Sequence, residues 1–206
     1  MPKPDPTALS VAATDTLRHL GPRRFSLTAV AEAASVSRGT VHNALGTREN
    51  AIAIALNRLA EAFIETMATA VGKEATLAEQ VAAAAVLICG HRQDSRSTPR
   101  GLNQSLLILL LEQGGDELMR RSVELWKPLV KAAQRTGEVD DSVDRARASE
   151  WIIRLLFSFE LLPPIGVNLG NPRAVRRFVS DHIVAGLTGS RAVAGGRVTG
   201  DRSPSR

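Results

Sequence analysis

The sequence predicts an all-α protein with a small N-terminal head and a larger helical body. Apolar residues recur at helical spacing over most of the 206 residues. No run of alternating apolar and polar residues is bounded by hairpin turns, so no strand is expected. Aromatic residues make up only 3% of the chain, so the core must consist mainly of Leu, Val, Ile and Ala, as in helix bundles. About nine helices are expected.

Three short helices are expected in the head, which we place in residues 1–50. The first covers residues 7–20, and the Gly-Pro dipeptide that follows stops it. Ser26 and Ser37 are expected to cap the second and third helices, because a hydroxyl oxygen accepts a hydrogen bond from a free N–H of the first turn. The third helix is expected to end near Leu45.

A long amphipathic helix, capped by Thr47, connects this head to a body in residues 51–188. Its apolar residues recur every three to four positions. The segment 92–100 is expected to be a polar, basic loop, and residues 189–206 a disordered basic tail. Further helices are expected over residues 76–91, 101–113, 116–136, 142–161 and 172–187.

The composition favours an anionic partner and excludes several classes of protein. The net charge of +5 makes nucleic acid a candidate partner, although such a charge is also ordinary for an arginine-rich chain. Cys89 is the only cysteine, so the chain cannot form an internal disulfide, and no zinc site is expected. The longest apolar run, residues 106–111, is too short to span a membrane, and the N-terminus does not resemble a secretory signal. We therefore expect a cytoplasmic protein without metal or cofactor.

Residues 26–48 have the layout of a helix-turn-helix. Ala31 is small, which lets two helices cross closely, and Val36 fills the gap between them after the turn. Val41 and Leu45 face inward from the second of these helices. The positions left outward on that helix carry small or polar side chains, which a DNA major groove accommodates.

The outward positions of this helix supply candidates for DNA contact. The free N–H groups at its start suit a phosphate, and Gly39 permits a close approach to DNA. Thr28, Thr40 and Asn43 are the candidates for reading bases, since the Asn amide can pair with the N6/N7 edge of adenine. Alternatively, the hydroxyl residues only cap helices and the others are merely exposed. The candidate DNA-contacting residues are Ser26, Thr28, Ser37, Arg38, Gly39, Thr40, His42, Asn43, Thr47 and Arg48.

The stretch Val-Ser-Arg-Gly-Thr-Val-His at residues 36–42, followed by Gly-Thr-Arg-Glu at 46–49, resembles the signature of TetR-family repressors. The resemblance covers about residues 8–67 by motif and the remainder by layout and length. It implies a dimeric repressor on a palindromic operator. Two heads about 34–36 Å apart would enter successive major grooves. A small hydrophobic ligand in the body would shift the long helix and release the DNA.

Four residues depart from the family pattern. Ser35 stands where the family usually has Gly at the turn, and Ser adopts the required backbone only at a cost. His42, Ala44 and Leu45 replace the usual Tyr, His or Tyr, and Phe. Family members often use such side chains to touch phosphate. His42 can do so, whereas Ala44 cannot.

The resemblance also implies a dimer interface on the last two helices and a ligand pocket among the others. The alternative is that these apolar faces form ordinary core within one chain. Candidates for the interface are Trp151, Leu155, Phe159, Val175, Phe178, Val179 and His182. Candidates for the pocket are Phe63, Met67, Val86, His91, Asn103, Leu106, Leu110, Leu118, Trp126, Arg154 and Phe157.

Two other classes of function compete with this hypothesis. An enzyme is not expected, because none of the four histidines stands at a catalytic spacing from a nucleophile or carboxylate. No phosphate-binding glycine loop is present either. The second class is an all-α ligand-binding or interaction protein whose head no longer binds DNA, which the departures at His42 and Ala44 leave open.

Overall fold

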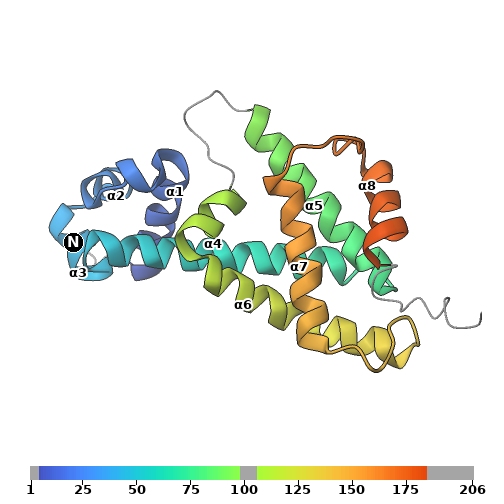
Figure 1. The fold of residues 1–206 in the computed structure, drawn as a ribbon. Coiled ribbons are helices and arrows are strands. Elements are labelled where there is room, and N and C mark those ends of the chain that lie inside the picture. Colours follow the sequence, from blue (N-terminus) through green and yellow to red (C-terminus); the bar gives the residue numbers. More distant parts are fainter. Residues whose placement is uncertain (1–4, 98–105, 185–206) are drawn as a thin grey trace, which may run out of the picture.

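A computed structural model describes residues 5–97 and 106–184, and of residues 92–97, 106, 183 and 184 only the backbone. Within these ranges the chain forms eight α-helices and one π-helical segment, without a strand (Figure 1). The predicted all-α class with about nine helices is therefore confirmed. None of the described helices is long and apolar enough to cross a membrane. Asn103 and the predicted tail at 189–206 lie outside the described residues.

The head contains three helices around a small core. They are α1 (Pro6–Arg24), α2 (Leu27–Ala33) and α3 (Arg38–Leu45). Helix α1 is broken at Gly21, which has φ 68° and ψ 170°, so the predicted stop is confirmed, with one further turn after it. Leu17, Phe25, Val30 and Val41 are buried where the three helices meet.

Helix α4 (Arg48–Val71) runs from the head into the body. In the head it packs against α1, and in the body against α5 and α6 (Figure 1). Its buried face confirms the predicted long amphipathic helix, since the buried positions recur at helical spacing. They are Ala51, Ala55, Leu59, Ala60, Phe63, Met67 and Val71.

The body consists of four further α-helices and the π-helical segment. These are α5 (Leu77–Ser97), α6 (Leu106–Arg135), α7 (Arg145–Leu161), α8 (Pro172–Phe178) and η1 (Val179–Val184). Helix α5 is central, because α4, α7, α8 and η1 all pack against it, and α7 packs also against α6.

One expectation about the body needs correction. The predicted loop at 92–100 is wrong for residues 92–97, because α5 continues to Ser97. Arg and Gln extend an existing helix easily, so a polar, basic composition does not by itself predict a loop. The predicted break between the helices at 101–113 and 116–136 is confirmed, because α6 has a non-helical backbone at Gly114 that divides it into two helical parts.

Candidate nucleic-acid interface

The helix-turn-helix is held by hydroxyl side chains at the start of each helix. Ser26 Oγ accepts a hydrogen bond from Ala29 N at 3.1 Å, and Ser37 Oγ accepts one from Thr40 N at 3.1 Å. Thr47 Oγ1 accepts one from the third residue of α4 at 3.2 Å. The three predicted caps are therefore confirmed, and they orient α2, α3 and α4 from within the local sequence.

The turn between α2 and α3 has the backbone that the sequence predicted. Ser35 has φ 54°, in the left-handed region that favours glycine. The turn closes through a hydrogen bond from Val36 N to Ala31 O at 3.0 Å. A left-handed residue other than glycine costs about 1 kcal/mol or more. The turn of the head therefore holds a residue that is strained in it.

The outward face of α3 is exposed and carries no large apolar side chain. Arg38, Gly39, His42 and Asn43 are exposed on it, together with the small Ala44. A face of this kind fits a major groove, because nothing bulky or apolar stands between the helix and the base edges. The candidate contacts of α3 thus lie on one surface.

Two threonines among the candidates differ in their surroundings. Thr28, on α2, is exposed. Thr40, on α3, is half-buried, and its Oγ1 lies 2.9 Å from Ser37 Oγ in a hydrogen bond. Thr40 therefore shares its hydroxyl with the cap of its own helix, whereas the hydroxyl of Thr28 is unconstrained by such a contact.

Gly39 is not required by the packing of the head. A Cβ atom added there would meet Ser37 Oγ at 3.7 Å, which is an ordinary van der Waals distance. Its helical backbone also suits any residue, and glycine weakens a helix relative to alanine. The missing side chain therefore makes room on the outside of α3 rather than within the protein.

Arg48 is engaged inside the head. Its Nε donates to the carbonyl oxygen of Phe25 at 2.9 Å, and its Nη2 donates to the carbonyl oxygen of Pro22. The remaining Nη1 lies 3.6 Å from Glu49 Oε1. Arg48 thus ties the start of α4 to the end of α1, a structural role that the sequence did not suggest.

Two exposed arginines in the last turn of α1, Arg23 and Arg24, were missed as candidates. They lie beside the carbonyls that Arg48 binds and add positive charge to the head. The signal was visible in the sequence as two basic residues after the Gly-Pro break. Basic side chains in such positions suit phosphate contacts.

In the body, the structure brings three of the predicted pocket residues together. The ring of Phe63 on α4 lies 6.3 Å from that of His91 on α5 and 6.4 Å from that of Phe157 on α7. We call these three residues the aromatic cluster. Of the other candidates, Val86 is half-buried, and the side chain of Leu106 lies outside the described part. Fully buried candidates are Met67, Leu110, Leu118 and Trp126.

Arg154 does not belong with these residues. Its side chain is 68% exposed and forms an ion pair of 2.6 Å with Glu150, one turn earlier on α7. An i,i+4 pair of this kind is typical of a solvated helix face. The prediction that Arg154 orients a ligand inside the body is therefore wrong.

The predicted interface residues divide into two groups. Phe178 stacks on His182 with a centroid distance of 4.8 Å and meets Phe159 edge-on at 6.1 Å. Trp151 and Leu155 are half-buried, as is Phe178, so these side chains have surface left for a partner. The second group is buried within the chain, Phe159 with an exposed fraction of 8% and Val175 and Val179 wholly. For these two valines the prediction of an interface is wrong, because they pack in the core where α8 and η1 lie on α5.

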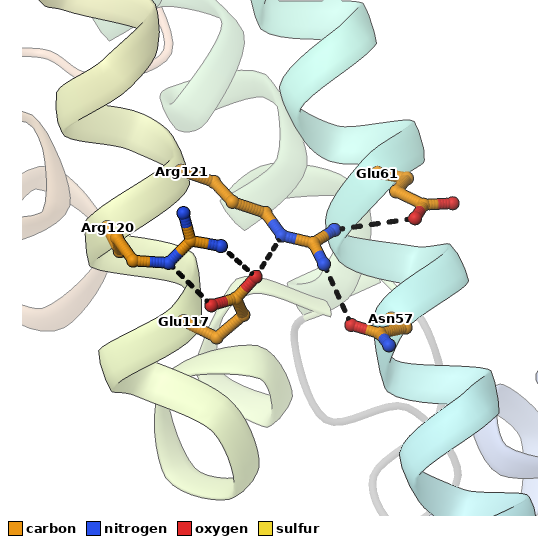
Figure 2. Close-up of polar contacts among 5 residues, drawn as sticks. All are labelled: Asn57, Glu61, Glu117, Arg120 and Arg121. Atoms are coloured by element: carbon orange, nitrogen blue, oxygen red, sulfur yellow. Dashed lines mark hydrogen bonds and ion pairs between the residues drawn. The ribbon is translucent and has the colours of Figure 1, made fainter.

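Arg121 of α6 connects the body to α4 (Figure 2). Its Nη2 donates to Asn57 Oδ1 at 2.9 Å, and its Nη1 lies 3.6 Å from Glu61 Oε1, both on α4. On its own helix, Nε donates to Glu117 Oε1 at 2.5 Å. Its side chain is 22% exposed, against 63% for that of Arg120. Arg121 thus joins a body helix to the helix that carries the head.

Glu117 holds this arginine in place. Hydrogen bonds from Arg120, and then from Arg121, lower the pKa of the Glu117 carboxyl group from 4.5 to about 2. Arg120 binds it with both Nε and Nη2, at 2.8 and 2.6 Å (Figure 2). The spacing of Glu117 to the two arginines was visible in the sequence as helical pairs. The contact with α4 was not, because it joins residues about sixty positions apart.

Comparison with known proteins identifies the fold through solved structures. No protein-family model matches the chain, and no curated protein matches it. Solved structures of the same fold are numerous. A TetR-family transcriptional regulator from Cytophaga hutchinsonii matches with a TM-score of 0.61 and 14% sequence identity, over 88% of this chain and 94% of that chain.

Two further structures were solved with bound molecules. The transcriptional regulator FadR from Bacillus subtilis, in complex with stearoyl-CoA, has a TM-score of 0.57 and 16% identity, over 85% of this chain and 98% of that chain. A cysteine mutant of the TetR family regulator CifR, complexed with 26-base-pair operator DNA, has a TM-score of 0.57 and 17% identity, over 91% and 96%. The chain therefore has the fold of TetR-family transcriptional regulators. The resemblance seen in residues 36–49 is confirmed at the level of the fold.

Proposed function

We propose that this protein is a DNA-binding transcriptional regulator that inserts α3 into the major groove. The observation that carries the proposal is the outward face of α3, which is exposed, polar and free of bulky apolar groups. Hydroxyl caps at Ser26, Ser37 and Thr47 hold that face on a compact head. Arg38 supplies a charge for phosphate, and Asn43 an amide for a base edge.

The head and the body are proposed to have different functions. The head, residues 1–50, binds DNA, and the body, residues 51–188, binds a ligand and a second copy of the chain. CifR, which shares the fold, was solved with operator DNA, and FadR with stearoyl-CoA, which supports both halves of this assignment. We infer a cytoplasmic dimer that represses by occupying a palindromic operator, and no catalytic role.

The contact of Arg121 with α4 could transmit a ligand-induced change from the body to the head. Arg121 bonds to Asn57 and lies beside Glu61 on α4, so a displacement of α6 is transmitted to the helix that carries the head. Two heads in a dimer must sit about 34–36 Å apart to read successive major grooves. A small ligand of largely apolar character, bound near the aromatic cluster, changes that spacing if it binds the released state more tightly.

The decisive experiment measures binding of the purified protein to DNA flanking its own gene, by fluorescence anisotropy at several salt concentrations. We expect affinity to fall steeply with salt, because phosphate contacts release counterions. Arg38→Ala is expected to lower the slope of log K against log[salt] by about one unit. Arg173→Ala, which removes an exposed arginine of α8, is the matched control and should leave the slope unchanged. Binding that does not respond to salt would contradict the proposal.

Gly39→Ala tests whether α3 approaches DNA closely. The added methyl group fits the protein, so thermal stability should stay level or rise, because alanine favours a helix by about 1 kcal/mol over glycine. Affinity for the operator should fall by about tenfold or more, since the methyl group stands between the helix and the DNA. An unchanged affinity would show that this part of α3 does not face DNA.

A further inference from the structure

Glu160 is a buried acidic residue with one oxygen atom that the described part of the chain leaves without a hydrogen bond. Its exposed fraction is 5%, and it lies near the C-terminal end of α7. Among the residues that the structure describes, its Oε2 atom is buried and has no hydrogen-bond partner. Buried polar groups are nearly always paired, because an unpaired one loses its water without compensation. Within the described part of the chain, this oxygen therefore has a hydrogen-bonding capacity that is not satisfied.

The place of this residue on α7 makes an unpaired carboxyl group more costly. The C-terminal end of a helix carries a partial negative charge, so an acidic side chain is unfavourable there and a cation is favourable. Both the Glu160 side chain and the backbone carbonyls at this end of α7 therefore favour a nearby positive charge. Arg154, the nearest basic residue on the helix, is exposed and occupied by Glu150.

Glu160 also adjoins the aromatic cluster. Residues three and four positions apart are neighbours on a helix surface, so Glu160 follows Phe157 and Leu156 on the same face of α7. Both of these neighbours are buried. Phe157 contacts Phe63, and Phe63 contacts His91, so Glu160 is a neighbour on α7 of one member of the aromatic cluster.

We propose that Glu160 is the polar anchor of the ligand site in the body, and that the ligand carries a positively charged nitrogen on an apolar frame. The charged nitrogen binds the carboxyl group at the end of α7. The apolar frame lies against the aromatic cluster, whose two phenylalanine rings also attract a cation. This inference rests on the proposed function, which places a ligand in the body, and it names the chemical class of that ligand. An anionic head group, such as a free carboxylate, is repelled at this position.

The test compares three probes that share an eight-carbon chain and differ only in the head group. Isothermal titration calorimetry of the full chain at neutral pH is carried out with n-octylammonium chloride, n-octanol and sodium octanoate. We expect octylammonium to bind about tenfold or more tightly than either of the others, the effect of one charge-assisted hydrogen bond. Tighter binding of octanoate or octanol, or no preference for octylammonium, would overturn the proposal.

Two variants test whether Glu160 causes the preference for octylammonium. Glu160→Gln should reduce octylammonium affinity about tenfold or more and leave octanol binding unchanged. Glu150→Gln, on the same helix but within its own surface ion pair, is the matched control and should bind octylammonium as the original protein does. Equal loss in both variants, or no loss in Glu160→Gln, would overturn the assignment.

Stability of the ligand-free protein gives a second readout, independent of binding. Glu160→Met replaces an unpaired polar group by an apolar one of similar length, so the thermal midpoint should rise. A lower midpoint would show that the carboxyl group has a structural partner and would overturn the proposal. None of these measurements involves DNA. Octylammonium binding without DNA binding would therefore contradict the proposed function alone, and DNA binding without octylammonium binding would contradict this inference alone.

Discussion

The head and the body of this protein are stabilised in different ways. In the head, α1 begins at the carboxylate cap of Asp5, α2 and α3 begin at the hydroxyl caps Ser26 and Ser37, and the break in α1 falls on a glycine. In the body, α6 is interrupted at Gly114, and α8 passes directly into a π-helical segment. The head is thus specified by short-range signals that favour one conformation. In the body, α7 and α8 also begin at side-chain caps, Asp144 and Asn171, but the irregular elements α6 and η1 rely on packing between helices.

The two regions also differ in what they leave exposed. The body carries a group of exposed apolar residues where α7 leads into α8, at Leu161, Leu162 and Ile165. In the head, Val11 is a large apolar residue that is exposed. Grouped apolar surface indicates a contact with a partner. The head therefore presents polar groups suited to nucleic acid, and the body presents apolar groups suited to a second chain.

The largest effect on this comparison is expected for Arg48→Ala. The substitution removes the two hydrogen bonds to the carbonyls of Phe25 and Pro22 that join α4 to α1. We expect the free energy of unfolding to fall by about 2 kcal/mol, as measured by urea denaturation. Arg24→Ala, an exposed neighbour, should change it by less than about 0.5 kcal/mol. A stable Arg48→Ala protein with weakened DNA binding would instead assign this arginine to a phosphate.

Ser35→Gly should stabilise the protein, by up to about 1 kcal/mol. Serine is strained at φ 54°, whereas glycine adopts this backbone freely, although part of the gain is lost to the greater flexibility of the unfolded chain. Gly137→Ala is the reverse control, because Gly137 has φ 78° with open space around it. It should lower stability by about 1 kcal/mol. If Ser35→Gly destabilises the protein, the turn of the head is not strained.

Arg121→Ala tests whether this arginine links α6 to α4 or is only a surface charge. It removes contacts with Asn57 and Glu61 on α4, and we expect a loss of about 0.5–1 kcal/mol in thermal denaturation. Arg120→Ala removes a pair with Glu117 alone, within one helix, and should cost less than that. Under the proposed mechanism, Arg121→Ala also weakens the effect of a bound ligand on DNA affinity. Identical behaviour of the two variants would rule out a special role for Arg121.

The smallest expected effect is a pH dependence at Glu117. The pKa of its carboxyl group is lowered to about 2 by its two arginines, from a usual 4.5. A lowered pKa stabilises the folded state above pH 4.5, and that contribution is lost as the pH falls from 4.5 to about 2. The thermal midpoint of the original protein should therefore approach that of Glu117→Gln over this interval. Because the group is exposed, the difference at neutral pH is expected to be small. If the thermal midpoints of the two proteins change in parallel with pH, Glu117 does not contribute to the pH dependence of stability.

Local signals were sufficient for most of the head. The caps follow from residue types at fixed spacing, because each depends on atoms within a few residues. The left-handed backbone at Ser35 was implied by the family resemblance, which has Gly at that position. The role of Arg48 could not be predicted, since it depends on carbonyls more than twenty residues away. The sequence shows that Arg48 can donate hydrogen bonds, but the tertiary packing determines which groups accept them.

In the body, the sequence by itself predicted the approximate limits of most helices and the apolar face of α4. Only the tertiary structure decided that Val179 is core rather than interface, that Arg154 is solvated, and that Glu160 Oε2 is buried with no hydrogen-bond partner among the described residues. Helical periodicity shows which residues share a face. It does not show which neighbour covers that face, because burial depends on how distant helices pack.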